Sequence, residues 1–187
     1  MADIMKREKR SVTYEDYLHF PVDGNRYEIL EGELFMTPAP TTHHQKVLKN
    51  LAFELESFLR KEGGGTLYIA PVDLLFNRFV VMQPDLIYLS KEQAHLDTGK
   101  AIEGGAPELV VEILSPSSVA LDRVFKFNVY ARLGVQWYWI VDPGACVIEE
   151  FILAEAAYSL VAEHKGDGSF SPRLFTGFTT LLPGIWA

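Results

Sequence analysis

An acidic residue inside an apolar run is the feature of this sequence best suited to chemistry. Glu112 lies within Leu109-Val-Val-Glu-Ile-Leu114, which is otherwise apolar and typical of a central strand. Burying a lone carboxylate is costly unless it pairs with a cation or binds a metal. Two interpretations therefore stay open: Glu112 is solvated or paired with Arg123 or Lys126 on the next helix, or it belongs to a functional site.

A second acid, Asp85, begins another apolar run. It follows Pro84 and opens the segment Asp85-Leu-Ile-Tyr-Leu89. By itself a Pro-Asp dipeptide is an ordinary turn signal. Together with Glu112 it gives two acids on neighbouring predicted strands, whose hard oxygen atoms suit Mg²⁺ or Mn²⁺. Such a pair leaves positions open for water and a phosphate oxygen, so the combination indicates metal-assisted phosphate chemistry.

A lysine could complete this site. Lys126 lies on a predicted helix over residues 117–133 and shares one helical face with Asp122 and Tyr130. If that face returns over the strand carrying Glu112, the ammonium group would stabilise charge or help to activate water. The alternative for Lys126 is a solvated surface position, the usual one for lysine. Tyr130 either lines the site or covers the sheet.

Other catalytic patterns are absent from the sequence. It has no Gly-x-Ser-x-Gly elbow, no phosphate-binding glycine loop and no cysteine cluster for zinc, and its one cysteine is Cys146. The neighbours His43 and His44 point in different directions on a helix, so they form a poor chelate. His44 falls on an apolar helical stripe and is either a hydrogen-bonded core histidine or a site residue.

The spacing of apolar residues predicts the elements that would position these side chains. A hairpin over Tyr27–Met36 turns at Glu31-Gly32, and a long helix ends at Gly63. The order of elements favours an α/β or mixed α+β domain with a mixed sheet. The predicted helices cover residues 13–20, 41–62 and 117–133, and the predicted strands after the hairpin cover 66–75, 85–89, 108–114, 136–141, 147–153 and 158–163.

Length and composition predict one domain. The chain has 187 residues and a net charge of −8. We expect a basic, flexible segment over residues 1–12 and a single domain over residues 13–187. A single cysteine, no apolar run of about 20 residues and no signal-peptide pattern indicate a cytoplasmic protein without a membrane partner.

The acidic balance counts against indiscriminate binding of nucleic acid. Binding to DNA would need a local basic patch, and the candidates are Lys46, Lys49, Arg123, Lys126 and Arg132. The aromatic segment Trp137-Tyr-Trp139 is explained either by a half-buried strand or by the surface of a homodimer, in which two sites would address two strands of a duplex.

Short motifs spread over the chain resemble the Uma-two family of predicted endonucleases. The resemblance runs from about Tyr14 to Pro183. That family is placed in the PD-(D/E)XK, or restriction-endonuclease-like, superfamily. The motifs are Tyr27-Glu-Ile-Leu-Glu-Gly-Glu33, His44, Pro84-Asp85, Pro107-Glu-Leu-Val-Val-Glu-Ile-Leu-Ser-Pro-Ser-Ser118, then Asp122, Lys126, Tyr130, Gly134-Val and Tyr138-Trp-Ile-Val-Asp-Pro143.

The resemblance implies a fold and a metal site. The fold would be a restriction-endonuclease-like core with a central mixed sheet flanked by helices, an extra N-terminal hairpin and C-terminal strands. Asp85 and Glu112 would bind Mg²⁺, or Mn²⁺, and Lys126 would complete the catalytic site of a DNA endonuclease. Glu31, His44, Asp122 and Tyr130 would line it.

One position departs from the superfamily pattern. The lysine expected two residues after the second acid is Leu114 here, so Lys126 would have to replace it in space. The superfamily often adds a further acid, for which the candidates are Glu28, Glu31, Glu33, Glu54 and Glu56. Leu114 and the negative charge favour an alternative function, a catalytically inactive nuclease fold that binds nucleic acid or protein.

Overall fold

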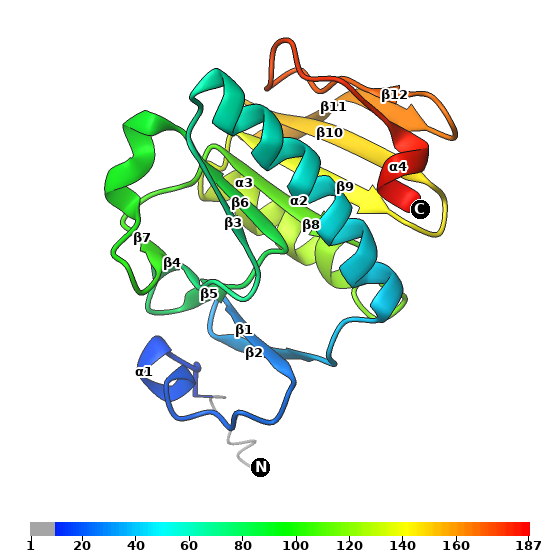
Figure 1. The fold of residues 1–187 in the computed structure, drawn as a ribbon. Coiled ribbons are helices and arrows are strands. Elements are labelled where there is room, and N and C mark those ends of the chain that lie inside the picture. The colour runs from blue at the N-terminus through cyan, green and yellow to red at the C-terminus, as the bar shows by residue number, and fades with distance from the viewer. Residues whose placement is uncertain (1–9) are drawn as a thin grey trace, which may run out of the picture.

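The computed structural model describes residues 10–187, which form a six-stranded sheet with helices on both faces and a five-stranded sheet at one end of it (Figure 1). Residues 1–9 of the predicted basic segment lie outside the described residues. Within residues 10–187, no helix is both long and apolar enough to span a membrane.

A six-stranded sheet forms the centre of the molecule. Its strands β8 and β9 are parallel and its other neighbours are antiparallel. A parallel pair needs a long crossover connection, which the predicted helix after β8 supplies. The strand order is β11 (Ala157–Lys165), β10 (Val147–Ala154), β9 (Trp137–Asp142), β8 (Leu109–Ile113), β6 (Leu86–Leu89) and β3 (Thr66–Ile69).

A five-stranded sheet lies against one end of the first. The predicted hairpin forms its edge and turns at Glu31 and Gly32, which both have positive φ. The single strand predicted over residues 66–75 is wrong, because the chain breaks after β3 and continues as β4 in this other sheet. The order is β2 (Glu33–Thr37), β1 (Arg26–Leu30), β5 (Val80–Met82), β4 (Leu74–Asn77) and β7 (Ile102–Glu103).

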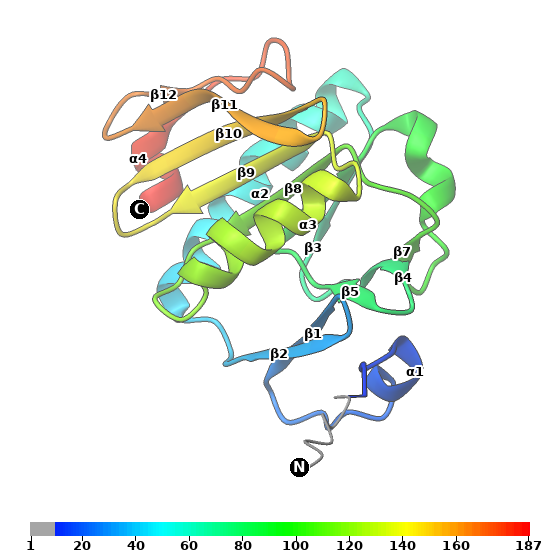
Figure 2. The same cartoon turned by 180° about the vertical axis from the view of Figure 1, so that it is seen from behind.

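Helices cover both faces of the six-stranded sheet. Helix α2 (Thr42–Glu62) is capped by Thr41 and ends at Gly63 in the left-handed conformation, as predicted. It lies on one face beside α4 (Leu182–Trp186), and α3 (Phe127–Arg132) lies on the other face (Figure 2). The remaining elements are α1 (Tyr14–Tyr17), the 3₁₀ helix η1 (Lys91–Leu96), the π-helical segment η2 (Leu121–Lys126), and the strand pair β12 (Ser169–Phe170) and β13 (Thr180–Leu181).

Strand alternation divides the core into two clusters. Val111 and Trp139 face α2 and the C-terminal segment, whereas Val110 and Tyr138 face α3 and the five-stranded sheet. The side chain of Glu112 lies on the same face of β8 as that of Val110, the face covered by α3. The side chains of Trp137 and Trp139 are buried within the chain, so they do not provide the exposed dimer surface that the sequence suggested.

Gly65, between the end of α2 and the start of β3, lies against the backbone of β6. A Cβ atom at Gly65 would lie 1.9 Å from the carbonyl oxygen of Leu89, which the β3–β6 pairing holds in place. Gly65→Ala should therefore destabilise the protein by about 1–3 kcal/mol through overpacking. Urea denaturation measures the loss. Gly168→Ala, whose Cβ would find its nearest neighbour at 3.6 Å, is the control, and equal stability of the two variants would contradict this packing.

Candidate active site

The pairing of β6 with β8 brings the two predicted acids together. Leu86, the first residue of β6, pairs with Val111, so Asp85 and Glu112 each lie one residue beyond this pair at the same end of the two strands. Each acid is 1% exposed, so the solvated alternative for Glu112 is wrong. Oδ2 of Asp85 also accepts a hydrogen bond of 2.8 Å from the backbone N–H of Ile113. The structure therefore ties Asp85 directly to the strand that carries Glu112.

Lys126 reaches the acid pair from the crossover segment. Its Nζ lies 2.9 Å from Oε1 of Glu112, 2.9 Å from Oε1 of Glu28 and 3.5 Å from Oδ1 of Asp122. The side chain is 2% exposed, so it is not a surface lysine. It is the last residue of η2, and π-helical segments occur frequently at functional sites. Leu114, where the superfamily has lysine, instead packs in the core beside α3.

Tyr130 adds a neutral donor to the same carboxylate. Its hydroxyl donates a hydrogen bond of 3.0 Å to Oε1 of Glu112, and its side chain is fully buried. Lys126 and Tyr130 therefore both contact Oε1 of Glu112. Tyr130 packs in the core and covers the sheet, which is one of the two alternatives from the sequence, and it contacts Glu112 from there.

Asp85 is held by His44 and by a residue that the sequence did not single out, Arg26. Nε2 of His44 lies 3.0 Å from Oδ2, and both Nη atoms of Arg26 lie 3.1 Å from Oδ1. His44 is buried whereas His43 is exposed, as their sequential positions on a helix predict. The sequence could have indicated Arg26, because it lies two residues before Glu28 on the same strand and residues at that spacing share one face.

Among the five candidate further acids, the structure brings Glu28 into the site. Its Oε1 contacts Lys126 and accepts the backbone N–H of Gln83 at 2.8 Å. Glu31 is instead exposed at the hairpin turn and pairs with Arg132 at 2.6 Å, so it does not line this site. Glu33, Glu54 and Glu56 also lie outside it.

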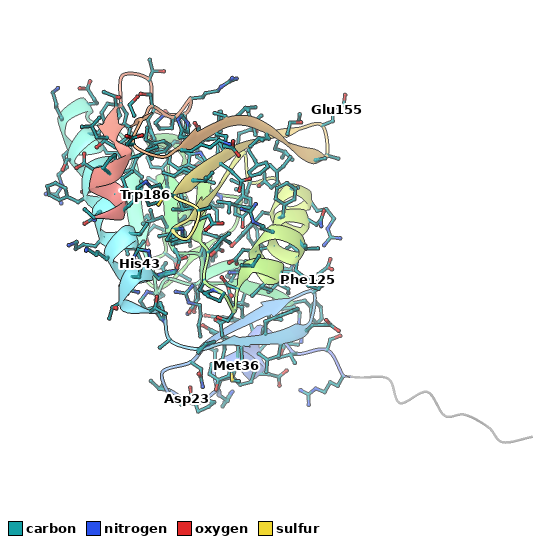
Figure 3. All side chains as sticks on the ribbon, turned by 90° about the vertical axis from the view of Figure 1, so that its right-hand side faces the viewer. Asp23, Met36, His43, Phe125, Glu155 and Trp186 are labelled. Carbon is teal, nitrogen blue, oxygen red and sulfur yellow. The ribbon has the colours of Figure 1, made fainter. Side chains whose placement is uncertain are left out.

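These groups line a cavity of about 180 Å³. Figure 3 shows its surroundings from the side, with His43 at the start of α2 above Met36 on the hairpin. The rim is polar and rich in proline and serine. The site residues in its wall are Arg26, Glu28, His44, Asp85, Glu112, Asp122 and Lys126, and its rim consists of residues 37–41 and 115–118.

The cavity wall carries more negative than positive charge. Four buried carboxylates, those of Glu28, Asp85, Glu112 and Asp122, face only two permanent cations, Arg26 and Lys126. Burial raises the pKa of Glu112 well above its ordinary value, although Lys126 opposes the shift. Burial likewise raises the pKa of Asp122. Burial thus disfavours the charged forms of Glu112 and Asp122 more than Lys126 favours them.

Asp85 and Lys126 shift in the directions that favour their charged forms. Burial alone would raise the pKa of Asp85, but the hydrogen bond from His44 and the charge of Arg26 lower it. Burial alone would lower the pKa of Lys126, but the carboxylates of Glu112 and Glu28 raise it above its ordinary value. Asp85 is therefore anionic and Lys126 cationic at neutral pH.

The donor chemistry of the cavity fits a hard divalent cation. The carboxyl groups of Glu28, Asp85, Glu112 and Asp122 all line the cavity, and oxygen atoms are the ligands that such a cation prefers. Within residues 10–187, however, no three acidic, histidine or cysteine side chains are arranged as a preformed metal site. At Asp85 the guanidinium group of Arg26 already donates to Oδ1.

The sheet order, the crossover helix and the acid pair with its lysine define the restriction-endonuclease-like fold. A solved structure, "a putative nuclease belonging to DUF820" from Anabaena variabilis ATCC 29413, shares this fold with a TM-score of 0.75 and 16% identity, covering 94% of this chain and 97% of that chain. The Uma2 family model, described as "Putative restriction endonuclease", matches residues 14–183, and the chain belongs to this family. No curated protein matches the chain.

Replacing Glu112 by glutamine should raise the melting temperature of the metal-free protein at neutral pH, because the buried wild-type carboxyl must either take up a proton or carry a charge there, whereas the amide does neither. Lys126 keeps Glu28 and Asp122 as ionic partners in the variant. The pKa of Glu112 is raised, so the wild-type carboxyl is neutral below that pKa and charged above it. The advantage of the variant should therefore grow as pH rises from the ordinary pKa of a glutamate, which applies in the unfolded chain, towards the raised pKa of the folded protein, and it should vanish below the ordinary value.

Thermal denaturation in EDTA from about pH 4 to 8 measures this difference, with about 2–4 °C expected for each kcal/mol. Glu56→Gln is the control, since Glu56 lies on the surface and pairs with Arg60. A Glu112→Gln variant that melts below the wild type at every pH would contradict the charge excess.

Proposed function

We propose that this protein is a metal-dependent endonuclease that hydrolyses phosphodiester bonds in DNA, with Mg²⁺ as its metal and Mn²⁺ as a substitute. The observation that carries the proposal is the position of Lys126. Its Nζ lies 2.9 Å from Glu112 although position 114, the superfamily's lysine position, is a leucine. An acid pair and a lysine are thus assembled in space on a nuclease fold.

The residues have distinct roles in this proposal. Asp85 and Glu112 would hold the metal, with Glu28 and Asp122 adding negative charge beside them. The bound metal would supply positive charge that stabilises the attacked phosphate. Lys126 keeps its proton because its pKa is raised, so it contributes charge at the phosphate and does not act as a base. Tyr130 and Glu28 hold Lys126 and Glu112 in register.

The surface that would meet DNA is smaller than the basic patch suggested by the sequence. Lys126 is buried in the site, Arg123 pairs with Glu149 at 2.6 Å, and Arg132 pairs with Glu31. Lys46 and Lys49 remain exposed on α2 without an ion pair among residues 10–187. They share a helix face with Phe53, which is 69% exposed and whose ring could stack on a base.

A second function is favoured by one observation. Arg26 engages Asp85 where an active site would need a free carboxylate, which suits a nuclease fold that binds nucleic acid or protein without turnover. Metal binding without cleavage would support this alternative.

Nicking of supercoiled plasmid in Mg²⁺ or Mn²⁺ tests the proposed activity. Asp85→Asn, Glu112→Gln and Lys126→Met should each lower the rate by about 100-fold or more, because each removes charge at the phosphate or at the metal. Lys126→Arg keeps the positive charge, so it serves as a second variant if Lys126→Met does not fold. Lys61→Met, at an exposed lysine, is the matched control. Unchanged nicking in Asp85→Asn and Glu112→Gln would overturn the assignment of the site.

The role of α2 is tested by DNA binding in Ca²⁺ as the salt concentration is varied. The double variant Lys46→Gln/Lys49→Gln should reduce the slope of log K against log salt by about 0.9 for each phosphate that the protein no longer neutralises. Lys61→Gln together with Lys165→Gln is the control, because these exposed lysines already pair with Glu62 and Glu163. Equal slopes for the two double variants would place the DNA elsewhere on the surface.

A further inference from the structure

The carboxylate of Asp85 is fully occupied in the metal-free protein. Oδ1 accepts hydrogen bonds from both Nη atoms of Arg26, and Oδ2 accepts from Nε2 of His44 and the backbone N–H of Ile113. A carboxylate offers about four lone-pair positions, so these contacts use all of them. Any cation that binds Asp85 must therefore displace one of its present partners.

The three partners differ in how easily they can leave. The N–H of Ile113 belongs to β8 and is fixed by the central sheet. The side chain of His44 is 7% exposed and is held on the first turns of α2. Arg26 is 18% exposed, reaches Asp85 through a long flexible side chain and lines the cavity. The geometry therefore makes Arg26 the partner that can exchange.

Arg26 also has a second acceptor that does not depend on Asp85. Its Nη1 donates a hydrogen bond of 3.1 Å to the carbonyl oxygen of Gln83. This bond can keep the guanidinium group at the cavity wall after it leaves Oδ1. A guanidinium group offers paired N–H donors that match the spacing of phosphate oxygens.

We propose that Arg26 is a resident counter-cation of Asp85 which a divalent metal displaces, and that the released guanidinium group then binds the phosphate of the nucleic acid. This inference rests on the proposed function, because it concerns the same metal and substrate. Arg26 would thus keep Asp85 compensated in the metal-free protein, set the affinity for metal and contribute to substrate binding. The exchange would replace the hydrogen bonds from Arg26 to Oδ1 of Asp85 by coordination of the metal, and no covalent bond changes.

Competition between Arg26 and the metal predicts a gain of metal affinity when Arg26 is removed. Arg26→Gln should bind Mn²⁺ at least tenfold more tightly than the wild type, as measured by calorimetry and by the EPR signal of free Mn²⁺. The same variant should bind DNA more weakly in Ca²⁺. A purely structural role for Arg26 would lower both affinities together. Arg78→Gln, at a 60% exposed arginine that pairs with Glu15, is the matched control.

Arg26→Lys keeps the test valid if Arg26→Gln does not fold, because one ammonium group cannot reproduce both contacts to Oδ1. It too should bind Mn²⁺ more tightly than the wild type. Metal binding that needs Asp85 but is unchanged or weakened in both Arg26 variants would overturn the exchange and leave the proposed function intact. Absence of Mn²⁺ binding in every variant, or binding unaffected by Asp85→Asn, would overturn the exchange together with the proposed metal dependence.

Discussion

The buried ammonium group of Lys126 is the constraint on which the site depends. A charge that is 2% exposed is tolerated only beside opposite charges, and Lys126 finds them on three separate elements, β1, β8 and η2. Those elements cannot shift relative to one another without leaving the ammonium or a carboxylate uncompensated. The network thus fixes the crossover segment against both sheets at the point where the cavity opens.

The same network joins the two sheets. Arg26 and Glu28 come from the five-stranded sheet, whereas Glu112 comes from the six-stranded one, and Asp85 lies where the chain passes from β5 to β6. Apolar packing also connects the sheets, since Leu30 and Met82 share a cluster with Val110 and Tyr138. The buried acids thus lie where the two sheets meet, and the apolar residues around them still form a continuous cluster.

The parts of this arrangement that follow from local patterns could be predicted from the sequence. The long helix, the hairpin, the strand around Glu112 and the position of Lys126 one helical turn after Asp122 all follow from spacing over a few residues. The contacts of Arg26 and Glu28 with the site could not, because they arise from pairing between β1 and the distant strand β5 through Ile29 and Val81. The break between β3 and β4 was missed because the apolar pattern continues across it, and β5 and β7 are too short to leave a pattern.

The pairing of β1 with β5 controls more than the order of a sheet. β1 lies between the edge strand β2 and β5, and Ile29 pairs with Val81. Because side chains on a strand alternate between faces, a slip of β1 against β5 by a single residue would turn Arg26 and Glu28 away from the cavity and put Tyr27 in their place. One residue inserted or deleted within β1 would therefore remove a cation and an anion from the site at once, whereas a change in the length of the hairpin turn falls on the edge strand β2.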